Sequence, residues 1–333
     1  MTLLPQELLK QTAPSTRPVI ALCEGSDPRV IAGALAANQA DLADIILVGD
    51  ATAIRAELAA QGGSEGSGIS IQDPDNSPLS YEFARVYREL RKHKGVNEDQ
   101  ARQAVLSPVV YAAMLVRLGF ATGTVGGAIF TTSDIVRSAI QVIGMAPEAA
   151  MVSSFFLMYP PENATPGARA MLYSDCGLVI DPSPQELAEI AKASSLSCRA
   201  LLRTDPKVAF LSFSTMGSAR HAAVDKVTEG LRIFKEAEPS IHADSELQFD
   251  AAFVASVGEL KAPESSVAGQ ANVMIFPNLD AGNIGYKITQ RLGGYTAIGP
   301  VMQGLAKPAN DLSRGCSAQD ITQMIAVTAL QAQ

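Results

Sequence analysis

A polar stretch close to the C-terminus gathers side chains that are capable of chemistry. Residues 306–321 read AKPANDLSRGCSAQDI and include six of them: Lys307, Asp311, Ser313, Arg314, Ser317 and Asp320. Ser317 and Asp320 have the spacing of a capping box, in which Asp320 would only cap the helix that follows. A carboxylate beside a hydroxyl and a guanidinium could also act as a base. The spacing is compatible with both roles.

Two further segments carry groups that bind anions. ELRKHKG, residues 89–95, places Arg91 at the end of an expected helix, where it complements the helix dipole or clamps a phosphate. GGAIFTTSDIVR, residues 126–137, reads as a Gly-rich turn that leads into a helix and offers backbone N–H groups to an anion. Its side chains would add donors: Thr131, Thr132, Ser133 and Arg137. Ordinary turn chemistry explains the same residues without a ligand, and LSFSTMGSAR, residues 211–220, repeats the pattern.

Composition disfavours several other classes of protein. The three histidines have no partner at metal-ligand or triad spacing, and four distant cysteines form no CxxC pair, so we expect no metal and no disulfide framework. The net charge of −8 disfavours binding to nucleic acid or to an anionic membrane. No apolar run approaches the ~18 residues of a membrane span. Because the N-terminus also lacks a signal-peptide pattern, we expect a cytoplasmic protein.

Strand-like and helical segments alternate along the chain, which predicts an α/β fold. With 333 residues, 47% of them apolar, the chain is long enough for two domains. We expect strands in PVIALCEG and DIILVGD, a helix over residues 80–94 that stops at Gly95, a hairpin after residue 150, and a last helix over residues 318–331. AAFVASVG, residues 251–258, fits a helix or a strand. The helix after residue 132 should bury one stripe: Val136, Ala139, Ile140 and Ile143.

Six segments, in order, resemble phosphate acetyltransferases of the short, single-module form: ELRKHKG, TTSDIVRSAIQVIG, LSFSTMGSA, ELQFDAAF, NVMIFPNLDAGNIGYKITQRLGG and GLAKPANDLSRGCSAQDI. The resemblance runs over nearly the whole chain. It implies two three-layer αβα domains with a cleft between them, as in isocitrate and isopropylmalate dehydrogenases. The first domain would be residues 1–147 plus 299–333, and the second, inserted domain would be residues 148–298.

The resemblance also implies a reaction, in which acetyl-CoA and phosphate give acetyl phosphate and CoA. The partners would be these four small molecules and a second copy of the chain in a homodimer. CoA would be a substrate, with no metal and no permanently bound cofactor.

Roles for individual residues follow from the resemblance. The family's base, hydroxyl and guanidinium match three residues: Asp320, Ser313 and Arg314. The groups linked to CoA or phosphate match five more: Arg91, Arg137, Thr131, Thr132 and Ser133. The chain departs from the family pattern at Phe130 and Ser138, where His and Pro are frequent. That departure leaves the chemistry intact and concerns local helix geometry and the acyl pocket.

The implied chemistry makes demands on the site. A free thiol has a pKa near ~8.5 and an Asp near ~4, so an unaided Asp falls short as a base by roughly 4 to 5 units, or about 6 kcal/mol. Arg314 can stabilise the thiolate, and partial burial can raise the pKa of Asp320. We expect direct thiolate attack in a ternary complex, with Asp320 as the base and with Arg314 and Arg137 on the phosphoryl group. An acyl-enzyme on Cys316 is disfavoured because no base stands at a recognisable spacing.

Three alternatives remain open at the level of sequence. The acyl group could be larger, as in a phosphate butyryltransferase. The chain could be a non-catalytic acetyl-CoA sensor, although the intact Ser313, Arg314 and Asp320 argue against that. A dehydrogenase on a related fold would need a carboxylate cluster for a metal, which the sequence does not show.

Overall fold

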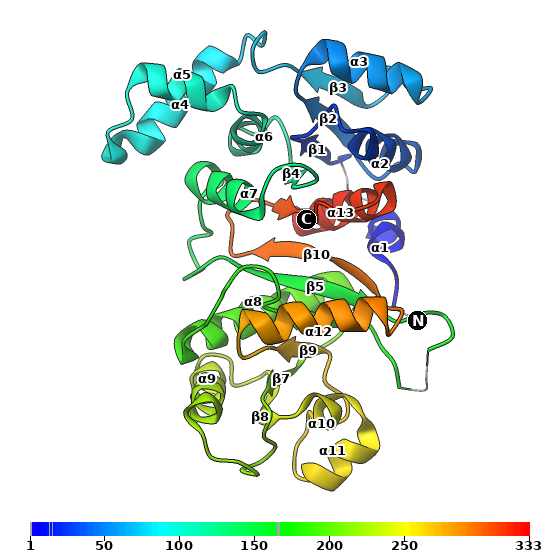
Figure 1. Cartoon of the computed structure of the whole chain (residues 1–333), viewed down its shortest axis with the longest axis vertical. Coiled ribbons are helices and arrows are strands. Elements are labelled where there is room, and N and C mark those ends of the chain that lie inside the picture. Colours follow the sequence, from blue (N-terminus) through cyan, green and yellow to red (C-terminus); the bar gives the residue numbers. More distant parts are fainter. Residues whose placement is uncertain (1, 13, 15, 165–166) are drawn as a thin grey trace. The chain divides into compact units, whose positions relative to one another are not determined.

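The structure is a computed structural model that describes residues 2–12, 14, 16–164 and 167–333 (Figure 1). The chain divides into two compact units. The terminal unit comprises Pro5–Glu148 and Leu305–Gln333, and the inserted unit comprises Ala149–Gly304 with Met1–Leu4. The expected boundary at residue 299 falls inside strand β10 (Thr296–Gln303), which pairs with β5 (Ser153–Tyr159) on both sides of that point.

The terminal unit is built on a five-stranded sheet in the order β11-β4-β1-β2-β3, with every neighbouring pair parallel. Its strands are β1 (Val19–Leu22), β2 (Asp44–Val48), β3 (Ile69–Gln72), β4 (Gly123–Gly126) and β11 (Ala309–Asp311). The short strand β11 was not anticipated, because its three residues carry no alternating pattern. It places Asp311 beside Gly126 at the carboxyl end of β4, which is the edge where open α/β sheets bind ligands.

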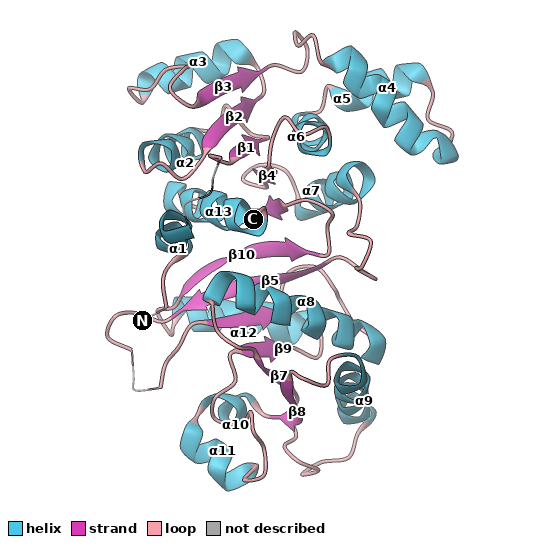
Figure 2. Ribbon diagram, turned by 180° about the vertical axis from the view of Figure 1, so that it is seen from behind, coloured by secondary structure: helices cyan, strands magenta, loops and turns pink. Residues whose placement is uncertain are grey.

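Helices cover both faces of this sheet (Figures 1 and 2). Helix α13 (Ala318–Gln331) packs on α2 (Pro28–Gln39), α1 (Pro5–Thr12), β4 and β1, whereas α6 (Pro108–Arg117) packs on β1, β2 and β4. Helix α3 (Ala51–Ala60) lies on β3, and α5 (Glu98–Val105) packs between α4 (Ser80–Arg91) and α6. The αβα architecture and the limits of the last helix are as predicted.

Two predicted helices have irregular ends. Helix α4 continues as a 3₁₀ turn, Lys92–Lys94, and stops at Gly95, whose φ of +74° is the left-handed conformation of a helix C-terminus. Helix α7 (Thr132–Ser138) continues as a π-helical turn, Ala139–Ile143. The π turn shifts the side chains away from the α-helical period. The predicted burial of Ile140 is therefore wrong: it is exposed, and Ile135 and Val142 are buried instead.

The inserted unit contains a six-stranded mixed sheet in the order β10-β5-β6-β9-β7-β8. Its other strands are β6 (Met171–Ser174), β7 (Lys207–Leu211), β8 (His242–Leu247) and β9 (Val273–Ile275). Strands β5 and β6 form the predicted antiparallel hairpin. The helices are α8 (Pro184–Leu202), α9 (Ala222–Ala237), α10 (Phe249–Phe253), α11 (Ala255–Lys261) and α12 (Leu279–Arg291). AAFVASVG therefore spans the end of α10 and the start of α11, with Val254 in an extended conformation between them. No helix in the described part of the chain is long and apolar enough to cross a membrane.

Candidate functional site

All eight predicted site residues belong to the terminal unit. They come from three segments: the SRGC loop (residues 312–317) with the start of α13, the β4–α7 loop (residues 127–131) with the start of α7, and the end of α4. Parallel strands bring the first two segments together, because β11 and β4 are neighbours and both loops follow the carboxyl ends of these strands.

Asp320 forms the predicted capping box of α13. Its Oδ2 accepts hydrogen bonds from the Ser317 backbone N–H at 2.8 Å and from the Ser317 hydroxyl at 2.9 Å. The Ser317 hydroxyl oxygen in turn accepts from the Asp320 N–H at 3.2 Å. Within the described residues, the other carboxyl oxygen, Oδ1, accepts no protein hydrogen bond. Capping therefore occupies Oδ2, and Oδ1 remains available to accept a hydrogen bond or a proton from a ligand.

Arg29 fastens the SRGC loop to the β4–α7 loop. Its guanidinium donates to the carbonyl oxygens of Arg314 at 2.8 Å, Cys316 at 3.3 Å and Ala128 at 2.9 Å. Asp27, the N-cap of α2, holds the other edge of the guanidinium at 3.1 and 2.8 Å. The same hydrogen bonds from Arg29 keep the pKa of Asp27 below its usual range. A bidentate ion pair thus fixes the backbone on which the Ser313 and Arg314 side chains stand exposed.

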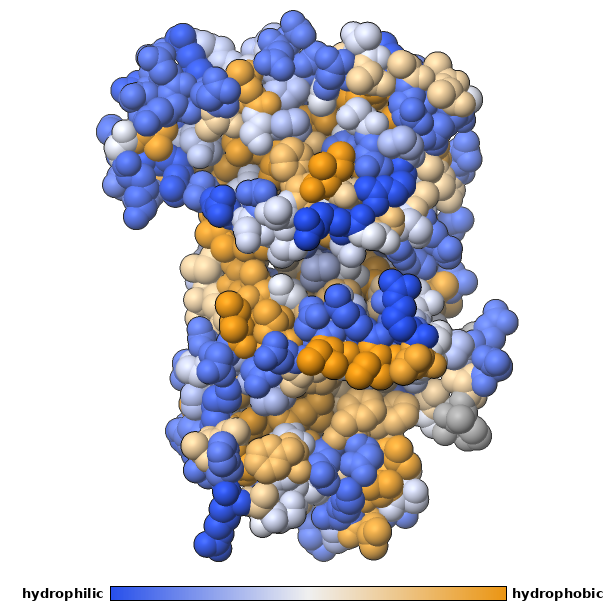
Figure 3. Space-filling model, viewed as in Figure 1, coloured by the Kyte–Doolittle hydropathy of each residue, from blue (hydrophilic) through white to orange (hydrophobic). Residues whose placement is uncertain are grey.

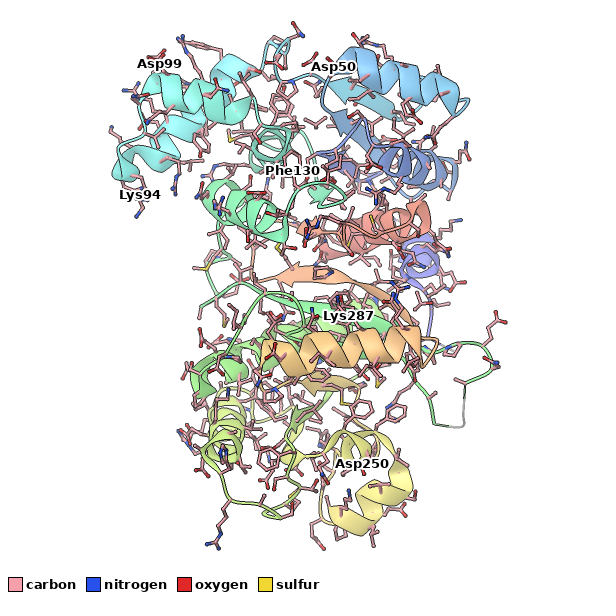
Figure 4. The ribbon with its side chains drawn as sticks, in the orientation of Figure 1. Asp50, Lys94, Asp99, Phe130, Asp250 and Lys287 are labelled. Atoms are coloured by element: carbon pink, nitrogen blue, oxygen red, sulfur yellow. The ribbon has the colours of Figure 1, made fainter. Side chains whose placement is uncertain are left out.

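The backbone N–H groups of the β4–α7 loop are not offered to an outside anion. Glu24, at the end of β1 and only 4% exposed, accepts from four consecutive ones. Its Oε1 accepts from Ile129 and Phe130 at 2.7 Å, and its Oε2 accepts from Ala128 at 2.8 Å and Gly127 at 3.0 Å. Figure 4 marks Phe130 in this loop. The expected anion site on these amides is therefore filled by a carboxylate of the chain itself.

Hydroxyl and guanidinium groups of α7 remain exposed beside this fixed loop. Thr131 caps the helix, and its hydroxyl also donates to Asp134 at 2.7 Å. Arg137 forms an exposed pair with Asp134 at 3.4 Å. The hydroxyl of Thr132 donates inward to Asp311 at 2.6 Å. Four side chains at the helix start are therefore exposed, three of them with hydroxyl groups and one with a cation: Thr131, Thr132, Ser133 and Arg137.

Asp311 is an ionisable group at this edge of the sheet to which no role was assigned. Its side chain is 1% exposed, and its Oδ1 is buried without a hydrogen-bond partner. Burial raises the pKa of this carboxyl to about 7. The Thr132 hydroxyl and the Leu312 backbone N–H oppose this rise, and the charge of Glu24 adds a smaller contribution to it. A carboxyl group that titrates near neutral pH therefore lies directly beneath an exposed hydroxyl of the candidate site.

Arg91 and Lys307 differ from the rest of the set. Arg91 ends α4, a helix that packs against the π turn after α7, and its Nε is buried without a hydrogen-bond partner. It shares no hydrogen bond with the other predicted site residues among the described positions. The ammonium group of Lys307 donates to the carbonyl oxygens of Val116 at 2.8 Å and Arg117 at 3.4 Å. Lys307 thus caps α6 and serves the fold.

Sequence reasoning missed Glu24, Arg29 and Asp311. Glu24 had a signal, since it lies two residues after the first strand and β1 is the neighbour of β4 in the parallel sheet. Asp311 lies in the quoted C-terminal motif, but its burial could not be anticipated without β11. Arg29 carries no signal, because the loop carbonyls that it binds lie about 100 and 290 residues away along the chain.

The arrangement can hold an anion by side chains. Several hydroxyl and guanidinium groups on two adjacent loops are exposed, their backbones are fixed from beneath by Glu24 and Arg29, and one carboxyl oxygen of Asp320 is unbonded. Guanidinium groups and hydroxyls are suited to phosphoryl oxygens. Among the described residues, no group of three or more His, Cys, Asp or Glu side chains is placed to hold a metal ion.

Comparison with known proteins gives a consistent assignment. The profile of the phosphate acetyl/butaryl transferase family matches residues 4–329. The phosphate acetyltransferase of Paracoccus denitrificans is 45% identical over 98% of this chain and 99% of its own length. A phosphotransacetylase of Streptococcus pyogenes superposes with a TM-score of 0.90 at 40% identity, covering 98% of both chains. The EutD phosphotransacetylase of Staphylococcus aureus gives a TM-score of 0.88 at 39% identity, covering 99% of this chain and 98% of its own. The chain therefore belongs to the phosphate acetyl/butaryl transferase family of acyltransferases.

Proposed function

We propose that the chain transfers an acetyl group between CoA and phosphate: acetyl-CoA and phosphate give acetyl phosphate and CoA, and the reverse. The observation that carries the proposal is the Arg29 clamp, which holds the SRGC loop and the β4–α7 loop as one surface. This surface presents Arg314 and Ser313 from one loop and the hydroxyls of α7 from the other. The names of the full-length relatives support the acetyl group and the phosphate acceptor.

In the direction of acetyl-CoA synthesis, the thiol of CoA loses its proton and attacks the carbonyl carbon of acetyl phosphate. We assign the proton to Oδ1 of Asp320, whose Oδ2 is held by Ser317. The guanidinium groups of Arg314 and Arg137 hold the phosphoryl oxygens, and the Ser313 hydroxyl donates to the carbonyl oxygen as it becomes negative. The carbon–oxygen bond then breaks, and phosphate leaves. Arg91 contributes a cation for the phosphates of CoA.

Direct transfer is favoured over an acyl-enzyme on Cys316. That thiol is 8% exposed, and burial raises its pKa to about 11, so very little thiolate exists near neutral pH. Cys316 contributes its backbone carbonyl to the Arg29 clamp. Replacement of Cys316 by Ala should therefore leave turnover within a few-fold of the wild type.

The first test is the phosphate-dependent release of free thiol from acetyl-CoA, with butyryl-CoA in parallel. The proposal expects release from acetyl-CoA that requires phosphate and exceeds release from butyryl-CoA. Faster release from butyryl-CoA would assign the chain to the larger acyl group. The absence of release from either thioester would favour a sensor that binds acetyl-CoA without chemistry.

The second test separates a base from a helix cap. Asp320→Asn keeps an oxygen that can accept from Ser317 but cannot take a proton, so turnover should fall by about 10³-fold or more with little change in CoA affinity. Ser317→Ala is the matched control. It removes the capping hydroxyl and should cost about 1 kcal/mol of stability while turnover persists. A fully active Asp320→Asn enzyme would leave Asp320 with the capping role alone.

We also propose that the chain forms a homodimer through α12. This helix and its C-cap residue expose an apolar row at a spacing of four residues: Ile284, Ile288 and Leu292 are 56%, 53% and 86% exposed. Figure 3 shows the row as a continuous hydrophobic band along α12. Exposed apolar bands of this kind mark association surfaces. Light scattering should give the mass of a dimer for the wild type and of a monomer for Ile288→Glu. A wild-type monomer, or an unchanged Ile288→Glu dimer, contradicts this interface.

A further inference from the structure

The Asp311–Thr132 pair joins a buried acid to an exposed hydroxyl across a single short hydrogen bond. Thr132 is the first residue of α7, and its hydroxyl lies 2.6 Å from Oδ2 of Asp311. Oδ1 of the same carboxyl lies over Gly127, where an added Cβ would come within 2.2 Å of it. Asp311 is therefore enclosed on one side by the β4–α7 loop, and Thr132 links its carboxyl to the exposed start of α7.

The surroundings of Asp311 work against a negative charge. Oδ1 is buried without a partner, and a charged oxygen in that state is costly. The facing groups from β1 are Glu24, which is occupied by four backbone N–H groups, and the buried thiol of Cys23, whose own pKa is raised, chiefly by burial. From α7, Asp134 and Arg137 are exposed and paired with each other. From α13, Asp320 is bonded to Ser317.

The direction of the hydrogen bond depends on the Asp311 proton. When Asp311 is ionised, its oxygen can only accept, and the Thr132 hydroxyl must donate inward. When Asp311 is protonated, its O–H can donate to the Thr132 oxygen, which frees the Thr132 proton to point toward solvent. A hydroxyl that donates outward can bind an anionic oxygen, whereas one that donates inward presents only lone pairs.

We propose that Asp311 is a positioning residue for anion binding: in its protonated form it donates to Thr132, and Thr132 then donates to a phosphoryl oxygen of the substrate. Ionised Asp311 turns the hydroxyl inward and adds a negative charge beneath the anion. The inference rests on the proposed function for the identity of the natural anion, which is phosphate or acetyl phosphate. The geometry itself requires only an oxyanion.

The test uses sulfate, because phosphate itself titrates near neutral pH while sulfate keeps its double charge. Sulfate binding to the whole chain is measured by calorimetry at pH 6.0 and pH 8.5. Because the pKa of Asp311 is about 7, the wild-type dissociation constant should rise about tenfold between the two. One hydrogen bond to a charged group has about this magnitude. Asp311→Asn carries a permanent N–H donor, so its dissociation constant should stay near the low-pH value at both pH values.

Two further variants make the test specific. The pH slope is the change in the sulfate dissociation constant between pH 6.0 and pH 8.5. Thr132→Val removes the hydroxyl and should bind sulfate weakly, with a pH slope well below that of the wild type. Asp134→Asn is the matched control, since it alters the other carboxyl–hydroxyl pair of α7 and should keep the wild-type slope. Equal slopes in the wild type and in folded Asp311→Asn would overturn the inference, as would a wild type that binds sulfate with no slope or not at all.

Calorimetry does not need turnover, so the inference and the proposed function can fail separately. A chain that binds sulfate with the expected slope but releases no thiol from acetyl-CoA would retain the Asp311 device and lose the proposed reaction. If thiol release depends on phosphate but the wild type and Asp311→Asn have equal pH slopes, the proposed reaction stands and the proposed role of Asp311 fails.

Discussion

Two Gly-containing turns of the molecule, the β4–α7 loop and the loop after β7, follow the same pattern in sequence and are held differently. The β4–α7 loop of the terminal unit is bonded by Glu24 through both carboxyl oxygens to four backbone N–H groups. In the inserted unit, the β7–α9 loop (residues 212–221) is held by Oε1 of Glu246, which accepts from the Ser214 hydroxyl and the Gly217 N–H, both at 2.7 Å. Among the described residues, the other oxygen of Glu246 accepts no hydrogen bond from this loop.

The comparison shows when a Gly-rich turn is an anion site. In both loops the side chain of a buried glutamate accepts from backbone N–H groups of the turn, which are groups of the kind that bind phosphate at helix N-termini. Where the fold supplies its own carboxylate, backbone amides are satisfied from within, and under the proposed function ligand binding would fall to the side chains that the turn displays. In the first loop those side chains are the hydroxyls of α7. Beside the second loop lies an open hollow of about 430 Å³ lined by Arg220, Glu246 and neighbours.

The largest expected effect comes from replacing the two glutamates that hold the loops. In Glu24→Gln an amide NH₂ must replace one of two bonded oxygens, which leaves about two buried N–H groups unsatisfied at roughly 1–3 kcal/mol each. We expect the free energy of unfolding to fall by about 5 kcal/mol. We also expect turnover to be lost. Glu246→Gln can keep its single bonded oxygen in place and should lose about 1 kcal/mol. Urea unfolding measures both, and similar losses would remove the distinction between the loops.

A second effect concerns the pH dependence of stability. The pKa of Asp311 is about 7 in the folded chain, against about 4 in an unfolded chain. Between these values the folded chain keeps a proton that the unfolded chain has lost, so stability falls as pH rises from 4 to 7 and the loss is complete above 7. Three pKa units correspond to about 4 kcal/mol. The difference between the wild type and Asp311→Asn in urea unfolding at pH 4.5 and 8 isolates this contribution, and an unchanged difference contradicts it.

A third effect sharpens the comparison at matched glycines, Gly127 and Gly217, which both have positive φ, at +110° and +79°. A Cβ at residue 127 would lie 2.2 Å from Asp311 Oδ1 and 2.7 Å from Leu312 N, whereas a Cβ at residue 217 meets nothing within 4 Å. Gly217→Ala should cost only the backbone strain of about 1 kcal/mol. Gly127→Ala should cost about 3 kcal/mol, since packing strain is added. Equal losses of stability for the two variants in thermal unfolding would show that the first loop can move to accommodate the added methyl group.

Much of the architecture could be predicted from local signals. The alternation of apolar runs and helical stripes indicated the α/β fold, and the Ser317–Asp320 spacing indicated the capping box that the structure contains. The π turn at Ala139–Ile143 could not be predicted, because the sequence there keeps a regular helical stripe. The strand β11 was too short to leave a pattern, and the burial of Asp311 depends on it.

The contacts that fix the candidate site are of a kind that single-sequence reasoning rarely finds. Glu24 and Arg29 act on backbone groups about 100 or more residues away, and backbone groups look alike in every sequence. The side chains displayed to solvent carry a signal in the sequence, because hydroxyl and guanidinium groups suit an anion, and their roles stay predictions. The scaffold beneath them needed the three-dimensional neighbourhood of β1, β4 and β11.

The most direct test of the central claim, that the SRGC loop and the start of α7 act on one phosphoryl group, is a double-mutant cycle. Arg314→Gln, Thr132→Val and the double variant are compared with the wild type in kcat/KM for phosphate. Groups that hold the same anion should couple by about 1 kcal/mol or more, so the double variant loses measurably less or more than the sum of the single losses. Additive losses, with coupling below about 0.3 kcal/mol, would contradict the account.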